Sequence, residues 1–133
     1  MVTVPQGTEI LLELPLPAEA TSVGRARAAA GEVARELGVP EVDVKVAVSE
    51  AVGNAVLHAF RDRGPGTITV RAYLDDARLV VAVSDDGAGM RPHLDSPGLG
   101  LGISLITKVA KDVRFDSTDA GTTVSMSFDG PTI

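Results

Sequence analysis

The chain has 133 residues, 44% of them apolar but only 3% aromatic, so we expect a single domain over residues 1–133 with an aliphatic core. Its formal net charge of −6 and its lack of cysteine argue against a nucleic-acid-binding surface, a disulfide framework and a thiolate site. No run approaches the roughly 18 apolar residues of a membrane span, and residues 1–7 lack a signal-peptide pattern, so a cytoplasmic protein is expected.

A strand is predicted near the start of the chain, over Thr8–Leu14. The strand has an apolar residue at every second position, and these residues should share one face of a sheet: Ile10, Leu12 and Leu14. Pro15 and Pro17 follow, and they are expected to end the strand because proline has no N–H for a strand ladder.

Two helices should come next. Thr21 and Ser22 are candidate N-caps for an alanine-rich helix over Val23–Leu37, and Gly38 is expected to stop it. The second helix is predicted over Glu41–Phe60. It is apolar over most of its circumference, which is typical of a helix buried against a sheet.

The rest of the chain is predicted to form two hairpins, with a glycine-rich loop and a third helix between them. The strands are expected over Thr67–Leu74, Arg78–Asp85, Val113–Ser117 and Thr122–Phe128. In the first of these, the inward side chains should be Ile68, Val70, Ala72 and Leu74. The third helix is predicted over Leu101–Ala110. The expected fold is α+β, a two-layer sandwich in which about three helices cover one face of a mainly antiparallel mixed sheet.

Glu50, Asn54 and His58 form a polar row on the otherwise apolar second helix. Their spacing of four residues places them on one side of that helix. Because buried polar groups need partners, the row should face a cleft, a ligand or a metal. The alternative is that it is the solvated stripe of an amphipathic helix.

Asp85 ends an apolar strand and is followed by Gly87 and Gly89. A carboxylate in this position can accept a hydrogen bond from an exocyclic amine, such as that of adenine, inside an apolar pocket. An ordinary Asp-Gly turn after a strand explains the same residues. Thr122, at the start of the last strand, could bond a base or Asp85, or could serve only as a β-former.

Gly98, Gly100 and Gly102 stand just before the third predicted helix. Alternate glycines let the backbone approach a phosphate, and a helix N-terminus adds a positive partial charge. The segment lacks the Gly-Lys-Ser/Thr of a Walker A loop and does not match a dinucleotide fingerprint. Taken alone, these glycines are weak evidence for a nucleotide.

In chain order, the four motifs resemble the N box, the two glycine boxes and the terminal Gly-Thr of the GHKL ATPases. This superfamily includes gyrase-type topoisomerases, histidine kinases and MutL-like repair proteins. The resemblance extends from Glu50 to Val124. Within the superfamily, the segment SEAVGNAVLHAF is similar to the bacterial anti-sigma factor serine/threonine kinases (RsbW-like). The resemblance implies the Bergerat ATP-binding fold, with ATP and Mg²⁺ as cofactors.

The resemblance also implies a role for each motif. Glu50 would be the general base that polarises a serine hydroxyl of a protein substrate, and Asn54 would coordinate Mg²⁺. Asp85 would bind the adenine amine. The rest of the nucleotide site would comprise His58, Gly87, Gly89, Met90, Gly98, Leu99, Gly100, Leu101, Gly102 and Thr122.

As partners, the resemblance implies a sigma factor, a STAS-domain anti-anti-sigma protein whose serine is phosphorylated, and a homodimer; neither nucleic acid nor a membrane is expected. The segment Met90–Pro97 is short for an ATP lid, since several relatives have a longer one. This departure leaves open a nucleotide-dependent protein-binding module without significant kinase activity. A histidine kinase fragment is disfavoured because the only histidines are His58 and His93, both in the region of the site.

Overall fold

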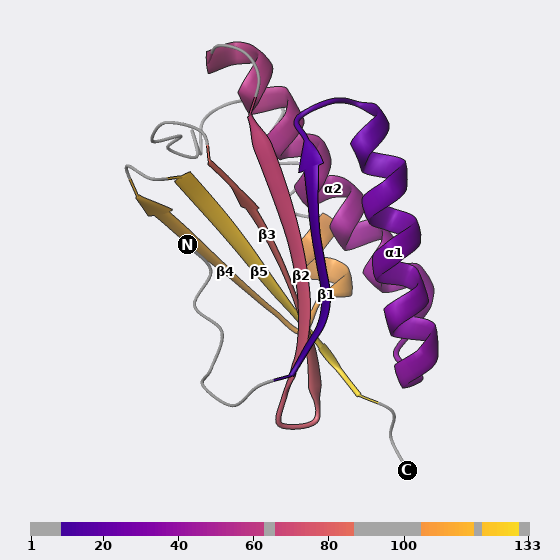
Figure 1. Ribbon diagram of the computed structural model, residues 1–133. Coiled ribbons are helices and arrows are strands. Elements are labelled where there is room, and N and C mark those ends of the chain that lie inside the picture. The colour runs from indigo at the N-terminus through magenta and orange to yellow at the C-terminus, as the bar shows by residue number, and fades with distance from the viewer. Residues whose placement is uncertain (1–8, 63–65, 87–104, 119–120, 131–133) are drawn as a thin grey trace.

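A five-stranded antiparallel sheet carries helices on one face in the computed structural model (Figure 1). The structure describes residues 9–62, 66–86, 105–118 and 121–130. The elements are β1 (Ile10–Pro17), α1 (Thr21–Leu37), α2 (Glu41–Asp62), β2 (Thr67–Asp75), β3 (Arg78–Asp85), β4 (Asp112–Thr118) and β5 (Gly121–Asp129). Residues 105–109 are also helical and belong to the third predicted helix. None of the described helices is long and apolar enough to cross a membrane.

The strand order is β1-β2-β3-β5-β4, and all four pairings are antiparallel. The predicted α+β two-layer fold is therefore confirmed, but the described strands form a purely antiparallel sheet and not a mixed one. The helices α1 and α2 pack on each other, α1 over β1 and β2, and α2 over β2, β3 and β5.

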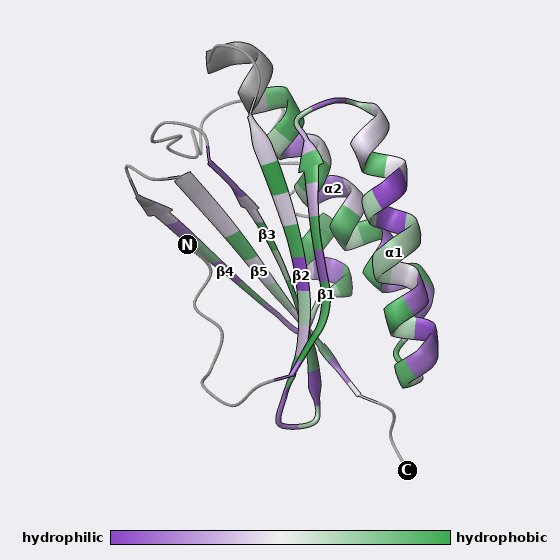
Figure 2. Cartoon of the chain, in the orientation of Figure 1, coloured by the Kyte–Doolittle hydropathy of each residue, from purple (hydrophilic) through white to green (hydrophobic). Residues whose placement is uncertain are grey.

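The hydrophobic core lies between the helices and one face of the sheet. Hydrophobic and hydrophilic residues alternate along β2 (Figure 2), and its predicted inward residues Ile68, Val70 and Ala72 are fully buried. Leu74 was also expected to point inward but is 40% exposed, because it lies at the hairpin end of the strand next to exposed residues of the turn. The helix α2 contributes Val44, Val48 and Val52 to this core.

The strand β1 differs from its prediction at both ends. It runs through Pro15 to Pro17 instead of ending at Leu14. Because β1 is the outermost strand, the missing N–H groups of the two prolines can lie on the free edge, where they cost no ladder hydrogen bond. A register shift between Ile10 and Leu12 takes Ile10 off the apolar face, and its side chain is 41% exposed.

The helix α1 begins at Thr21, before the predicted start at Val23. Its N-cap is Ala20, which makes no side-chain capping hydrogen bond, and Thr21 is already helical. Ser22 is buried, and its Oγ donates a hydrogen bond to the carbonyl oxygen of Pro17, 2.6 Å away. The hydroxyl thus ties the helix to the end of β1 and does not cap it. Gly38 ends the helix in a left-handed conformation with φ 73°, as predicted.

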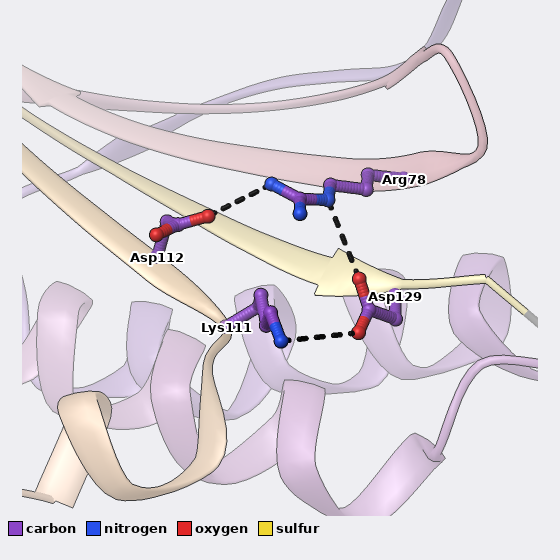
Figure 3. Close-up of polar contacts among 4 residues, drawn as sticks. All are labelled: Arg78, Lys111, Asp112 and Asp129. Atoms are coloured by element: carbon purple, nitrogen blue, oxygen red, sulfur yellow. Dashed lines mark hydrogen bonds and ion pairs between the residues drawn. The ribbon is translucent and has the colours of Figure 1, made fainter.

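A cluster of ion pairs joins β3, β4 and β5 at the end of the sheet where β3 begins (Figure 3). Arg78 Nη1 lies 2.8 Å from Asp112 Oδ2, and its Nε lies 3.3 Å from Asp129 Oδ1. Lys111 Nζ lies 3.9 Å from the other oxygen of Asp129. All four side chains are well exposed, so these pairs contribute little to stability.

Tyr73 lies on the sheet face away from the helices, yet it is only 7% exposed. Burial raises the pKa of its hydroxyl above the ordinary value, and the nearby Asp75 carboxylate raises the pKa further. It is the only tyrosine, and there is no tryptophan, so tyrosinate absorbance reports on this residue alone. We expect a spectrophotometric titration of the folded protein to give a midpoint above that of free tyrosine.

The same shift makes stability depend on alkaline pH. The unfolded chain releases the tyrosine proton at about pH 10, before the folded protein does. The stabilising contribution of neutral Tyr73 is therefore complete below that pH, and it is lost as the pH rises through the folded pKa. Denaturant unfolding of a Tyr73→Phe variant should show a smaller alkaline loss of stability than the parent. A midpoint at the value of free tyrosine would contradict this account.

Candidate functional site

Glu50 and Asn54 lie one turn apart on α2, and both are half-buried. Their neighbours Ala51 and Ala55 are buried in the core. The two polar residues therefore stand at the boundary between the packed side of α2 and its outer surface. His58 lies one turn further along the same helix, but its side chain is outside the described part of the chain.

A second group of polar residues crosses three strands at one end of the sheet. Asp85 of β3 lies directly opposite Thr122 of β5, which in turn lies opposite Ser117 of β4. The hydroxyl oxygens of Ser117 and Thr122 are 3.3 Å apart and share a hydrogen bond. Side chains alternate along a strand, and Val81 and Val83 are buried under the helices, so the row is on the helix-covered face. Ser117 was not predicted as a site residue.

Two consecutive acidic residues at the end of β3 have different surroundings. The Oδ1 of Asp86 accepts a hydrogen bond from the backbone N–H of Thr67 at 2.8 Å, and the N–H of Asp86 donates to the carbonyl oxygen of Thr67. Asp86 thereby fastens the end of β3 to the start of β2. Asp85 has the opposite side-chain direction and belongs to the helix-covered face. This division of roles between the two carboxylates depends on strand pairing, and the Asp-Asp-Gly sequence alone did not indicate it.

Gly121 holds the start of β5 close to the end of β3. Its φ is 138°, and a Cβ at this position would overlap the carbonyl oxygen of Asp85. Only glycine adopts such a backbone without strain. Gly121 allows the close approach of the two strands, and Thr122 then lies beside Asp85. Each residue of the predicted terminal Gly-Thr therefore has a structural role.

The chain connections bring the C-terminal end of α2 and the polar row of Asp85 and Thr122 to the same end of the fold, whereas Glu50 lies near the middle of α2. The helix α2 leads from Asn54 through its C-terminal turns towards Thr67, and Thr67 is hydrogen-bonded to Asp86 beside Asp85. Figure 1 shows the C-terminal part of α2 at the same end as the start of β2 and the end of β3. The remaining predicted site residues lie outside the described part: Gly87, Gly89, Met90, Gly98, Leu99, Gly100, Leu101 and Gly102.

Glu50 and Asn54 of α2 and the residues of the polar row all present oxygen atoms. They offer carboxylate, amide and hydroxyl oxygens above an aliphatic core, with acceptors that suit an amine and hard oxygen ligands that suit a small cation. Polar groups of these kinds beside an apolar layer are the chemistry that lines small-molecule sites. The roles of the individual residues stay predictions.

Comparisons with known proteins identify the family of the chain. The family described as "Histidine kinase-like ATPase domain" matches residues 16–128. The serine-protein kinase RsbW of Bacillus velezensis is 33% identical over 87% of this chain and 83% of its own length. The anti-sigma F factor of Clostridium acetobutylicum is 34% identical over 67% of this chain and 73% of its own.

Solved structures show the same fold. The RsbU and RsbW domains of a Mycobacterium tuberculosis protein superpose with a TM-score of 0.69 and 25% identity, over 91% of this chain and 32% of that longer chain. The catalytic domain of the histidine kinase ThkA, at 16% identity and a TM-score of 0.55, shares the fold over 91% of this chain and 97% of its own. The chain belongs to the histidine kinase-like (GHKL) ATPase family, in the branch that contains the RsbW serine-protein kinases and the anti-sigma F factors.

Proposed function

We propose that this protein binds Mg²⁺ and ATP and phosphorylates a serine of a STAS-domain anti-anti-sigma protein, and that in its other state it binds a sigma factor. The observation that carries the proposal is the half-buried pair Glu50 and Asn54 on α2, a helix whose C-terminal end lies at the same end of the sheet as the polar row of Asp85 and Thr122. Relatives with these names, serine-protein kinase and anti-sigma F factor, support it.

The nucleotide would be held at both groups of residues. Asp85 would accept a hydrogen bond from the adenine amine, with Thr122 and Ser117 beside it. The amide oxygen of Asn54 would be a ligand of Mg²⁺. Among the described residues, no three acidic or histidine side chains gather into a cation site. This suits Mg²⁺, which usually keeps several waters and binds substrate phosphates with only one or two protein oxygens.

In the transfer step, the serine oxygen of the acceptor attacks the γ-phosphorus of ATP. The new O–P bond forms as the bond between that phosphorus and the β-γ bridging oxygen breaks, and ADP leaves. The proton of the serine hydroxyl passes to the carboxylate of Glu50. Positioning and charge stabilisation supply most of the catalysis in such reactions, and Glu50 on α2 would add the acceptor for the serine proton.

The proposal is tested with the STAS-domain proteins encoded in the same genome, each purified and incubated with this protein, MgCl₂ and γ-labelled ATP. Phosphoserine on one of them, located by mass spectrometry, is the expected result. Nucleotide-dependent capture of a sigma factor or STAS protein without any transfer would instead support the alternative, a binding module without significant kinase activity. Failure to bind ATP at all would refute both.

Replacing Asp85 with asparagine is expected to weaken ATP binding by about 1.5–3 kcal/mol, on the order of 10- to 100-fold, because a charged acceptor is lost. Titration calorimetry with ATP would measure this change. The matched control is Asp86→Asn, whose amide oxygen can still accept the hydrogen bond from Thr67 N–H. An Asp85→Asn variant that binds ATP as tightly as the parent would remove Asp85 from the nucleotide site.

A further inference from the structure

We propose that a ridge on α2, formed by Val46, Glu50, Gly53 and Leu57, is the surface on which the protein acceptor docks, with Gly53 as a notch that admits the serine to Glu50. The inference rests on the proposed kinase function and names the part of the chain that recognises the substrate. The four residues have the spacing i, i+4, i+7 and i+11, which forms one continuous line along a helix.

The sides of α2 are identified by what they contact. Lys45 is on the α1 side, because a Cβ at Gly31 of α1 would lie 2.5 Å from its Cε. Successive residues of a helix are about 100° apart. Viewed from Glu50, Gly53 is therefore turned about 60° towards the α1 side, and Asn54 about 40° the other way.

The opposite side of α2, away from α1, is the side of β5 and the polar row that includes Thr122. Asn54 is turned towards this side, where the nucleotide would bind. Gly53 is turned away from it. Glu50 thus lies between a nucleotide side and a second side, and the ridge follows the second side.

Packing against the residues that the structure describes does not explain Gly53. It lies in the interior of a long helix, where glycine lowers helix stability relative to alanine. A Cβ built on it would have no described atom within 4 Å, whereas a Cβ on Gly31 would crowd Lys45. The space over Gly53 is therefore open in the described part of the chain, directly beside the predicted catalytic carboxylate.

The other two residues of the ridge are apolar and at least partly accessible. Leu57 is 43% exposed and Val46 is half-buried. Single exposed leucines are common on protein surfaces, but this one is aligned with an unexplained glycine and with Glu50. Apart from Glu50, the ridge carries no charge.

The reaction itself determines what covers this ridge. A general base must come within about 2.6–3.2 Å of the hydroxyl that it deprotonates. A serine held that close to Glu50 brings its own chain over the positions one turn away, which are about 5.4 Å along the helix axis. The neutral character of Val46 and Leu57 then favours an acceptor loop with small or apolar side chains beside its serine.

The test is a steady-state comparison with the STAS-domain acceptor that the parent protein phosphorylates. We expect Gly53→Gln and Leu57→Gln to raise the KM for this acceptor at least about tenfold, since each places a polar side chain in a docking contact. The affinity for ATP, measured by calorimetry without the acceptor, should not change. Gly53→Ala should raise the thermal midpoint of unfolding, because alanine favours a helix more than glycine does. The thermal midpoints of Gly53→Gln and Leu57→Gln show whether poor folding explains a change in KM.

The matched control is Gly24→Gln on α1, where a Cβ would make only an ordinary contact of 3.8 Å with the Arg27 side chain. It should leave the acceptor KM unchanged. An unchanged acceptor KM in both ridge variants would overturn the inference and leave the kinase function intact. Weaker ATP binding by Gly53→Gln would also overturn it, because the notch would then belong to the nucleotide site. No transfer by the parent to any STAS protein would overturn both proposals.

Discussion

Replacing Glu50 with glutamine is expected to slow phosphoryl transfer by on the order of 10²- to 10⁴-fold, the usual contribution of a general base. Glutamine has nearly the same shape as glutamate, so the half-buried position on α2 should be filled as before. Its neutral amide cannot take the serine proton. Single-turnover transfer to the acceptor gives the rate, and titration calorimetry should show unchanged affinity for ATP.

Asp43→Asn is the matched control for this variant. Asp43 is also half-buried, and it lies seven residues before Glu50, on the same side of α2. Its loss should affect only the N-terminus of the helix, by about 0.3–1 kcal/mol of stability, and should leave transfer intact. If Glu50→Gln instead lost ATP binding and transfer to the same extent, Glu50 would be a nucleotide-binding residue and the proton would need another acceptor.

Local patterns were enough to predict most of the elements of this fold. The helix α2 and the hairpin of β2 and β3 were predicted to within two residues, because apolar periodicity and turn residues are properties of the neighbouring sequence. The predicted end of β1, at Leu14, came too early because the tolerance for Pro15 depends on β1 being an edge strand. The position of a strand within a sheet is set by distant segments, and no local pattern contains it.

The same distinction separates the site residues that could be predicted from those that could not. Glu50 and Asn54 are linked by a spacing within one helix, which the sequence displays directly. Ser117 joins the polar row only through the register of β4 on β5, and Asp86 has its structural role only through β2. A cross-strand neighbour cannot be identified until the strand order and register are known.

Gly121→Ala is expected to cost about 3 kcal/mol or more in the free energy of unfolding, which combines backbone strain at a positive φ with overpacking. The φ of 138° is unfavourable for alanine, and its Cβ would overlap the carbonyl oxygen of Asp85 and lie 3.3 Å from the Cα of Asp86. Relief requires a shift between β5 and β3. Denaturant unfolding would measure the loss, and Gly24→Ala, which meets only the Arg27 side chain at 3.8 Å, is the control that tests a glycine-to-alanine change without overlap.

The consequence of this variant for ligand binding separates two views of the site. If Asp85 and Thr122 hold the nucleotide together, a shift of β5 against β3 should weaken ATP binding, because it changes the distance between these two residues. The Gly121→Ala variant, studied at a temperature where it is folded, should then bind ATP less tightly than the parent, while Gly24→Ala binds normally. A stable Gly121→Ala variant with full ATP affinity would mean that the start of β5 can move freely, and that the pairing of Asp85 with Thr122 does not form the nucleotide site.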